Sequence, residues 1–228
     1  MYFDLDTLDG AGSNKLLHAT IIPRPIAWVT SLDGHGAVNV APFSFFNLMS
    51  GDPPLLCLCI GARNGKPKDT AANIAARGEF VVNLVSHPLA RRMNVTAIDF
   101  DADVDESLEA QLALAPSRQV AVPRLADSPA SFECRTRQLI DIDGRRTLVL
   151  ADIAGMHVMD AAVSDSARLY IDPAPMQLIA RLHNPGWYCG IGQAFQMPTP
   201  TPERWRQMQA AGEAQDYLAG VPGQQSQS

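Results

Sequence analysis

Long apolar runs, an excess of basic residues and a secretion signal are all missing from this sequence. No run approaches the roughly 18 apolar residues that a membrane-spanning helix needs. Lys and Arg number 18 against 24 Asp and Glu, and the formal charge of −6 argues against general nucleic-acid binding, which usually shows as a basic surface. The start, Met-Tyr-Phe-Asp-Leu-Asp, has neither the basic residues nor the apolar core of a secretion signal. We therefore expect a cytoplasmic protein that binds no nucleic acid and no membrane.

Cysteines are also few, and the four present do not have the spacing of a disulfide framework. Cys57 and Cys59 lie two positions apart in an apolar run, so on a strand they would share one face. We expect two reduced packing thiols, because a metal pair would need further ligands nearby. No metal site is expected either, because the alternating aspartates of residues 99–105 lack the central glycine and closing glutamate of a calcium loop.

What the sequence does contain is a series of strand patterns. With 46% hydrophobic residues among 228, the chain can bury a full core. Apolar and β-branched runs between turn residues predict strands at 26–31, 37–46, 55–60, 79–85, 132–142 and 147–159, with Gly155 as a candidate bulge. Short helices are expected at 70–76 and within an insertion at 87–114. Because helices do not alternate with strands, an antiparallel barrel is favoured over a doubly wound sheet.

The chain is expected to have three parts. Residues 1–19 are predicted to be a polar lead-in, and residues 20–190 the main domain. Residues 191–228 are predicted to hold a helix at 203–218 and a Gln/Ser tail that should be disordered.

A basic, glycine-rich loop follows the strand at 55–60 and opens a helix. Arg63, Lys66 and Lys68 supply positive charge, and Asp69 or Thr70 is placed to cap the helix. A helix N-terminus offers free backbone N–H groups and a partial positive charge, which together bind phosphate. The hydroxyl of Thr70 adds a donor. Taken alone, the loop fits either a phosphate site or an ordinary solvated helix cap.

An aromatic segment precedes that strand. Phe43, Phe45 and Phe46 surround Ser44, which offers a hydroxyl and backbone amides beside apolar rings. The isoalloxazine ring of a flavin needs apolar walls for its faces and hydrogen bonds along its edge. The predicted hairpin partner, residues 28–31, could supply more edge contacts. Taken singly, each aromatic side chain is more typical of a core than of a ligand site.

Five short motifs carry a family resemblance. They are Arg24-Pro-Ile-Ala-Trp-Val-Thr-Ser31, Asn39-Val-Ala-Pro-Phe-Ser-Phe-Phe46, Asp52-Pro-Pro54, Lys68-Asp-Thr70 and Arg181-Leu-His-Asn-Pro-Gly-Trp-Tyr188. Because these motifs occur together and in this order, the chain resembles the flavin reductase-like, FMN-binding split-barrel family. Its most similar members are the flavoredoxins and the reductase partners of two-component monooxygenases. The resemblance covers residues 18 to 190.

The resemblance implies a mainly β, Greek-key split barrel with short covering helices and a C-terminal helix. It also implies a homodimer with FMN near the subunit interface. The residues implied for the flavin ring are Trp28, Val29, Thr30, Ser31, Asn39, Pro42, Phe43, Ser44, Phe45 and Phe46. Those implied for the phosphate are Arg63, Lys68, Asp69 and Thr70. His183 matches a histidine that, in related reductases, lies where nicotinamide would stack, so it is the predicted catalytic residue.

Hydride transfer from nicotinamide to a flavin needs positioning but no acid, base or nucleophile from the protein. The resemblance therefore implies an NAD(P)H-dependent FMN reductase, with NAD(P)H as a transient co-substrate and a monooxygenase or another redox protein as partner. Two alternatives stay open. One is a flavoredoxin-like carrier that keeps FMN bound, and the other is a flavin or small-ligand binder without redox turnover.

Overall fold

The computed structural model describes residues 1–101, 104–192 and 194–220. Contacts divide the chain into two compact units, Met1–Gly190 and Ile191–Ser228. Part of the acidic loop at 99–105 lies outside the described residues, and so does the tail whose disorder the sequence predicts. Among the described residues, no helix is long and apolar enough to cross a membrane.

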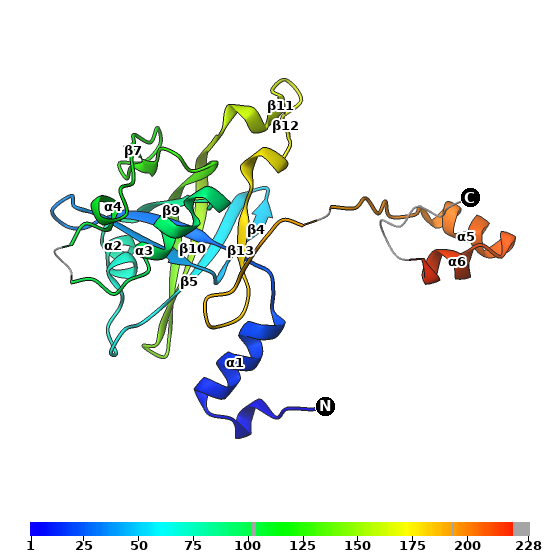
Figure 1. The fold of residues 1–228 in the computed structure, drawn as a ribbon, viewed down its shortest axis with the longest axis horizontal. Helices are drawn as coiled ribbons and strands as arrows, with labels where there is room; N and C mark the ends of the chain where they lie inside the picture. Colours follow the sequence, from blue (N-terminus) through cyan, green and yellow to red (C-terminus); the bar gives the residue numbers. More distant parts are fainter. Residues whose placement is uncertain (102–103, 193, 221–228) are drawn as a thin grey trace. The chain divides into compact units, whose positions relative to one another are not determined.

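The larger unit is built on one large antiparallel sheet (Figure 1). Its seven strands follow the order β3-β2-β6-β9-β10-β5-β4. Three hairpins, β2–β3, β4–β5 and β9–β10, supply six of these strands, and β6 lies between β2 and β9. The bounds are β2 Ala27–Leu32, β3 Val38–Phe43, β4 Phe46–Gly51, β5 Pro54–Gly61, β6 Glu79–Asn83, β9 Ala130–Ile142 and β10 Arg146–Val158. The predicted mainly β, antiparallel architecture is confirmed.

The two edge strands, β3 and β4, are separated only by residues 44–45, so the sheet curls around a single apolar interior. Val29, Phe80 and Val149 are fully buried there, and helix α2 (Asp69–Arg77) adds Ile74. Removing this apolar surface from water is the main favourable term for the barrel. The same packing fixes α2, and with it the basic loop, beside β3.

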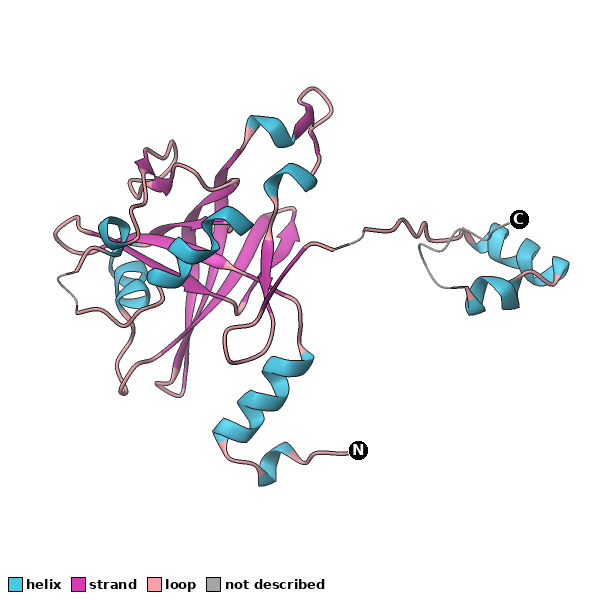
Figure 2. Ribbon diagram, viewed as in Figure 1, coloured by secondary structure: helices cyan, strands magenta, loops and turns pink. Residues whose placement is uncertain are grey.

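Shorter elements surround the barrel (Figure 2). Helices α2, α3 and α4 all contact β3. A three-stranded sheet of β1, β13 and β14 lies apart from the seven-stranded one. The remaining bounds in the larger unit are η1 Leu5–Thr7, α1 Gly10–Thr20, β1 Arg24–Pro25, η2 His87–Leu89, α3 Ala90–Val95, α4 Glu106–Glu109, β7 Leu114–Ala115, β8 Arg124–Leu125, η3 Asp160–Ala162, β11 Val163–Asp165, β12 Tyr170–Ile171, η4 Ala174–Met176, β13 Ile179–Arg181 and β14 Tyr188–Gly190.

Two predictions about local structure are confirmed. The β9–β10 ladder has a register shift between Ile153 and Gly155, which places a bulge where the sequence predicts one. All four cysteines are free thiols, and Cys57 and Cys59 share one face of β5, as predicted. That face is half-buried and lies opposite the core residues Leu56, Leu58 and Ile60.

Four other expectations are corrected. The strand expected over 37–46 ends at Phe43 and restarts at Phe46. The polar lead-in forms helix α1, and α2 is preceded by Lys68, which makes no side-chain cap, rather than being capped by Asp69 or Thr70. The single C-terminal helix is two, α5 Pro202–Ala211 and α6 Ala214–Ala219, because Gly212 adopts a left-handed conformation with φ of 78°.

Candidate functional site

A groove follows the end of β3 and the start of α2. Two adjacent cavities of about 540 Å³ and 190 Å³ form it, and they share Pro42, Phe43 and Ala97. The larger cavity reaches the basic loop at 63–68, and the smaller one reaches Ser44 and the β13–β14 hairpin. We call the two cavities together the β3 groove. It joins the basic loop and the aromatic segment that the sequence predicts to act on one ligand.

The basic end of the groove carries exposed cations. Arg63, Lys66 and Lys68 all line it. Within the described residues, no side chain caps the first turn of α2, so its backbone N–H groups stay available to an anion. Arg63 lies 3.4 Å from Asp99, but both side chains are largely exposed, and such a pair contributes little. This end of the groove is suited to a phosphate group.

Behind the basic end lies a hydrogen-bonded network centred on Asn39. Its Oδ1 accepts a 2.7 Å bond from Thr70 Oγ1, and its Nδ2 donates a 2.8 Å bond to Glu106 Oε1. The other oxygen of Glu106 accepts the Val40 N–H at 3.1 Å. Burial raises the pKa of the Glu106 carboxyl above its ordinary value, although these hydrogen bonds act in the opposite direction. The Thr70 hydroxyl is thus engaged within the protein and orients the wall of the groove.

The other end of the groove combines apolar surface with polar and charged groups, among them Arg24 and Arg181. Ile26, Pro42, Phe43 and Met93 supply apolar surface. Ser44 lies in the two-residue link between β3 and β4, and its Oγ accepts a long 3.4 Å bond from Arg24 Nε. Flat apolar walls bordered by a few polar groups are typical of sites for aromatic cofactors.

Phe45 and Phe46 face a third cavity of about 320 Å³, which shares His18, Arg24 and Ser44 with the β3 groove. We call it the Arg24 pocket. The rings of Phe45 and His18 are perpendicular, with centroids 5.3 Å apart, and the guanidinium carbon of Arg146 lies over the Phe45 ring, 5.0 Å from its centroid. Phe46 also packs against the barrel interior. The aromatic segment is therefore divided between two cavities.

Residues 28–31 are not brought to the groove. All four are fully buried, and the backbone of residues 28–30 pairs with β3 on one side and β6 on the other, which leaves no free edge for a ligand. Trp28 Nε1 donates to Thr96 Oγ1, and Thr30 Oγ1 donates to a backbone carbonyl. Ser31 contacts Asn39 and Asn73 at 3.4 Å and 3.2 Å. These residues support the groove from behind.

His183 is exposed in the loop between β13 and β14. Its ring stacks on Trp187, with centroids 5.6 Å apart and planes inclined by 14°. His183 is not among the lining residues of the groove, whereas its neighbour Asn184 is. The structure places a flat aromatic pair beside the groove rather than a histidine inside it.

Sequence reasoning missed several lining residues. His18 was read as part of a polar lead-in, where nothing in the local pattern marks it. Arg24, Arg181 and Tyr188 lie within the family motifs but received no role, and a charged residue between two prolines, as at Arg24, is the signal that could have identified it. Glu106 falls within the predicted helical insertion, and no local pattern links its carboxylate to Asn39 or to the groove.

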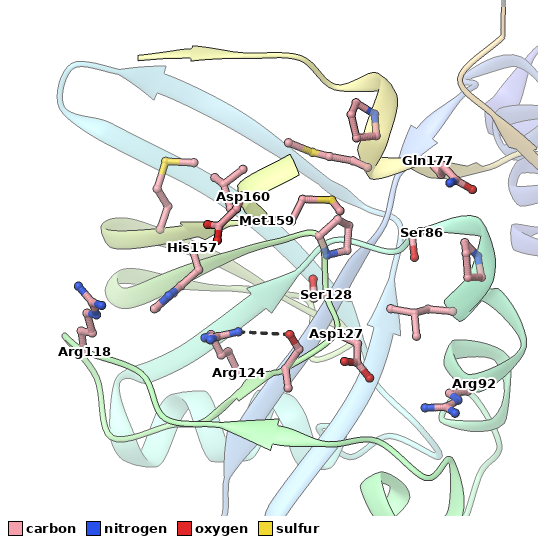
Figure 3. A pocket seen from close by; sticks show the side chains of 18 residues that line it. Ser86, Arg92, Arg118, Arg124, Asp127, Ser128, His157, Met159, Asp160 and Gln177 are labelled. Atoms are coloured by element: carbon pink, nitrogen blue, oxygen red, sulfur yellow. Dashed lines mark hydrogen bonds between the residues drawn. The ribbon is translucent and has the colours of Figure 1, made fainter. Parts of the chain in front are cut away.

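A fourth cavity, of about 970 Å³, opens elsewhere on the barrel (Figure 3). Arg118, Arg124 and His157 lie toward one end of it, and Ser86 and Gln177 toward the other. Beneath it, Glu133 is almost fully buried and accepts bonds from His157 Nε2 and from the backbone N–H groups of residues 118–120. The charged groups of this cavity include both signs, and its buried acid is fully hydrogen-bonded.

Comparison with known proteins identifies the family. Residues 19–178 match the flavin reductase-like domain family, and the chain belongs to it. An uncharacterized protein of Deinococcus radiodurans is 39% identical over 221 residues, which cover 95% of this chain and 97% of that protein.

Two solved structures are similar over most of the chain. Nitrilotriacetate monooxygenase component B from Bacillus cereus has a TM-score of 0.82 and 27% identity, over 86% of this chain and 98% of that one. The 2-nitrobenzoate 2-nitroreductase of Pseudomonas fluorescens has a TM-score of 0.81 and 33% identity, over 89% of this chain and 98% of that one. The fold is therefore the split barrel of flavin reductase-like proteins, as the five motifs predicted.

The residues present fit a flavin nucleotide. A flavin joins a flat ring to an anionic phosphate, and the β3 groove joins an apolar end to a cationic helix entrance. The free N–H groups of α2, with Lys66 and Lys68, suit the phosphate. Family membership and this chemistry together support a flavin cofactor and an oxidoreductase class of activity.

Proposed function

We propose that this protein is an NAD(P)H-dependent reductase that binds FMN in the β3 groove. The observation that carries the proposal is the groove itself, which places Lys66, Lys68 and the free N–H groups of α2 at one end and apolar walls at the other. FMN rather than FAD is favoured because the cationic end suits a terminal phosphate. When bound, FMN would supply a two-electron acceptor for hydride from a nicotinamide.

The chain's own residues would bind and orient the reactants. Lys66, Lys68 and α2 hold the phosphate, while Asn39 and Thr70 keep the groove wall in place. Pro42 and Phe43 would supply apolar surface for the ring. The stacked pair of His183 and Trp187 offers an exposed flat surface on which a nicotinamide could lie. No residue is required to move a proton in this scheme.

We further propose a homodimer. Apolar side chains remain exposed on the segment after α1 and on the edge strand β4, namely Ile22, Leu48 and Met49. An exposed edge strand that carries apolar residues is usually paired or covered. Sedimentation velocity on the wild type, on Leu48→Glu and on Leu169→Glu as an exposed control would test this. A wild-type monomer would exclude the dimer.

The reductase is tested by anaerobic mixing of FMN-loaded protein with NADH or NADPH. Loss of the visible flavin absorbance, together with repeated turnover of added free FMN, is expected. A monooxygenase that uses free reduced FMN would then be the fitting partner. Bound flavin that only a reduced protein donor can bleach would favour the flavoredoxin-like carrier. Protein that cannot be loaded with FMN would contradict the proposal.

A further inference from the structure

Arg24 is a buried cation whose charge is not neutralised by any carboxylate among the described residues. Only 6% of the surface of Arg24 is exposed. Nη1 donates to the carbonyls of His18 and Ile21 at 2.9 and 2.8 Å, and Nη2 donates to the carbonyl of Leu182 at 2.6 Å. These acceptors are neutral, so they satisfy hydrogen bonds without supplying a counter-charge. Buried guanidinium groups are usually paired with an acid, because an isolated buried charge is costly.

Other cations surround the same place. Arg181 lies over the Tyr188 ring and donates to the Tyr188 hydroxyl at 2.6 Å and to Asn184 Oδ1 at 2.7 Å. Arg146 lies over Phe45. Across the described residues, neither these two arginines nor Arg24 is within salt-bridge distance of a carboxylate. No aspartate or glutamate is among the described residues that line the Arg24 pocket or the adjoining end of the β3 groove.

His18 adds a donor that lacks an acceptor. Asn184 Oδ1 accepts from Arg181, so its amide nitrogen is the atom 3.4 Å from His18 Nδ1. An amide nitrogen only donates, so this contact is a hydrogen bond only with a neutral imidazole that accepts at Nδ1. The hydrogen is then on Nε2, which is buried without a partner within the described chain. Burial and the neighbouring arginines lower the pKa of His18, which is consistent with this neutral form.

The walls of the Arg24 pocket define the rest of the ligand. Leu17, Ile21, Pro23 and Phe46 line it, so most of its surface is apolar. Its volume of about 320 Å³ lies at the lower end for ligand sites, which is the range for a single-ring molecule. A small hydrated anion such as phosphate would gain nothing from these walls.

We propose that the Arg24 pocket binds a small aromatic carboxylate. Its ring lies against the apolar side chains, and its carboxylate lies at the end lined by His18, Arg24 and Ser44, where the charge of Arg24 attracts it. A rotation of the His18 ring, whose Nε2 is closed to solvent in the structure, then lets Nε2 donate a hydrogen bond to the carboxylate. The pocket shares His18, Arg24 and Ser44 with the β3 groove, so the bound acid lies beside the groove. Binding of the acid stands independently of the proposed flavin chemistry. Its use as the substrate of that chemistry rests on the proposed function.

The test is calorimetric titration of the full chain with benzoate, with benzamide as a neutral molecule of the same shape, and with inorganic phosphate. One benzoate molecule is expected to bind per chain. Benzamide and phosphate are expected to bind with about tenfold or more lower affinity, because only benzoate offers both a charge and a ring. Equal binding of benzoate and benzamide, or no binding of benzoate, would overturn the proposal.

Location is tested by variants and by a spectroscopic probe. His18→Phe keeps a ring against Phe45 but removes the donor, and we expect it to weaken benzoate about tenfold. His35→Phe, in an exposed turn, is the matched control and should not change binding. Benzoate should shift the side-chain nitrogen resonances of His18 and not those of His35. Unchanged benzoate affinity in His18→Phe would overturn the proposal. This test does not depend on Arg24→Met, which removes the buried charge and with it three hydrogen bonds to backbone carbonyls that support the fold.

Repeating the titration with FMN present separates this proposal from the proposed function. Benzoate is expected to bind with FMN in place. Direct competition between the two would overturn the proposal of a separate pocket. If FMN does not bind at all, the proposed function fails while the benzoate result still decides the pocket.

Discussion

Thr70 Oγ1 donates a 2.7 Å hydrogen bond to Asn39 Oδ1, which ties the first turn of α2 to β3 directly behind the basic end of the groove. Thr70 is almost fully buried. Its hydroxyl therefore stabilises the fold as well as the shape of the site. In this respect it differs from Lys68, which is exposed.

Thr70→Val should destabilise the protein by about 1 to 3 kcal/mol, because it leaves Asn39 Oδ1 without its strong donor in a buried place. Thr70→Ser, which keeps the hydroxyl, should cost less. Urea unfolding followed by fluorescence measures both changes. Equal stability of Thr70→Val and the wild type would show that the bond contributes nothing to folding.

Lys68→Ala should leave stability unchanged and weaken FMN by about 1.5 to 3 kcal/mol, roughly tenfold to a hundredfold, because one charge-assisted contact to phosphate is lost. Riboflavin lacks the phosphate, so its affinity should be the same in the variant and the wild type. Lys15→Ala, an exposed lysine on α1, is the matched control. A similar loss for riboflavin and FMN would place Lys68 elsewhere than at the phosphate.

Several features of this site could be predicted from sequence because they are local. The basic loop, the helix that follows it and the aromatic segment each follow from neighbouring residues, and the five motifs place them in one fold. The division of the aromatic segment between two cavities could not be predicted. It depends on the break at Ser44, which sends Phe43 toward the groove and Phe45 toward the Arg24 pocket.

Long-range contacts account for the remaining gaps. The resemblance implies residues 28–31 for the ring, but all four are buried, and residues 28–30 pair with both β3 and β6. The order of strands in a sheet is not visible in a strand pattern. Glu106 reaches Asn39 across 67 residues, and His18 reaches Asn184 across 166. Such contacts are set by topology, so no local pattern marks either residue.

Glu106 should make stability depend on pH in a characteristic direction. Its folded-state pKa is raised above the unfolded value by burial. The folded state therefore takes up the proton first, and the resulting stabilisation is present below the unfolded pKa and lost as pH rises through the folded pKa. Relative to Glu106→Gln, which does not titrate, the wild type should gain stability as pH falls from neutral toward 4. A parallel pH dependence of both proteins would contradict this.

Glu133 should show the opposite dependence. Burial alone would raise its pKa, but the bonds from backbone N–H groups and from His157 outweigh burial, and its pKa is lowered. The stabilisation that ionised Glu133 gives the folded state is present above the pKa that Glu133 has in the unfolded chain. It is lost as pH falls through the pKa that Glu133 has in the folded protein. Glu133→Gln puts a donor in place of an acceptor beside the N–H groups of residues 118–120 and should cost about 1 to 3 kcal/mol at neutral pH. That cost should shrink in acid, which denaturant unfolding at several pH values would measure.

His183→Ala should weaken the use of NAD(P)H and leave FMN affinity unchanged, because the imidazole stacks on Trp187 beside the groove and does not line it. Removing one ring of the stacked pair takes away half of the flat surface proposed for the nicotinamide. The KM for NAD(P)H should rise, while FMN titration gives the wild-type dissociation constant. His87→Ala, an exposed histidine elsewhere on the barrel, is the control. If His183→Ala lowered FMN affinity and kept the KM, the ring would belong to the flavin site, and the nicotinamide would have to approach from another side.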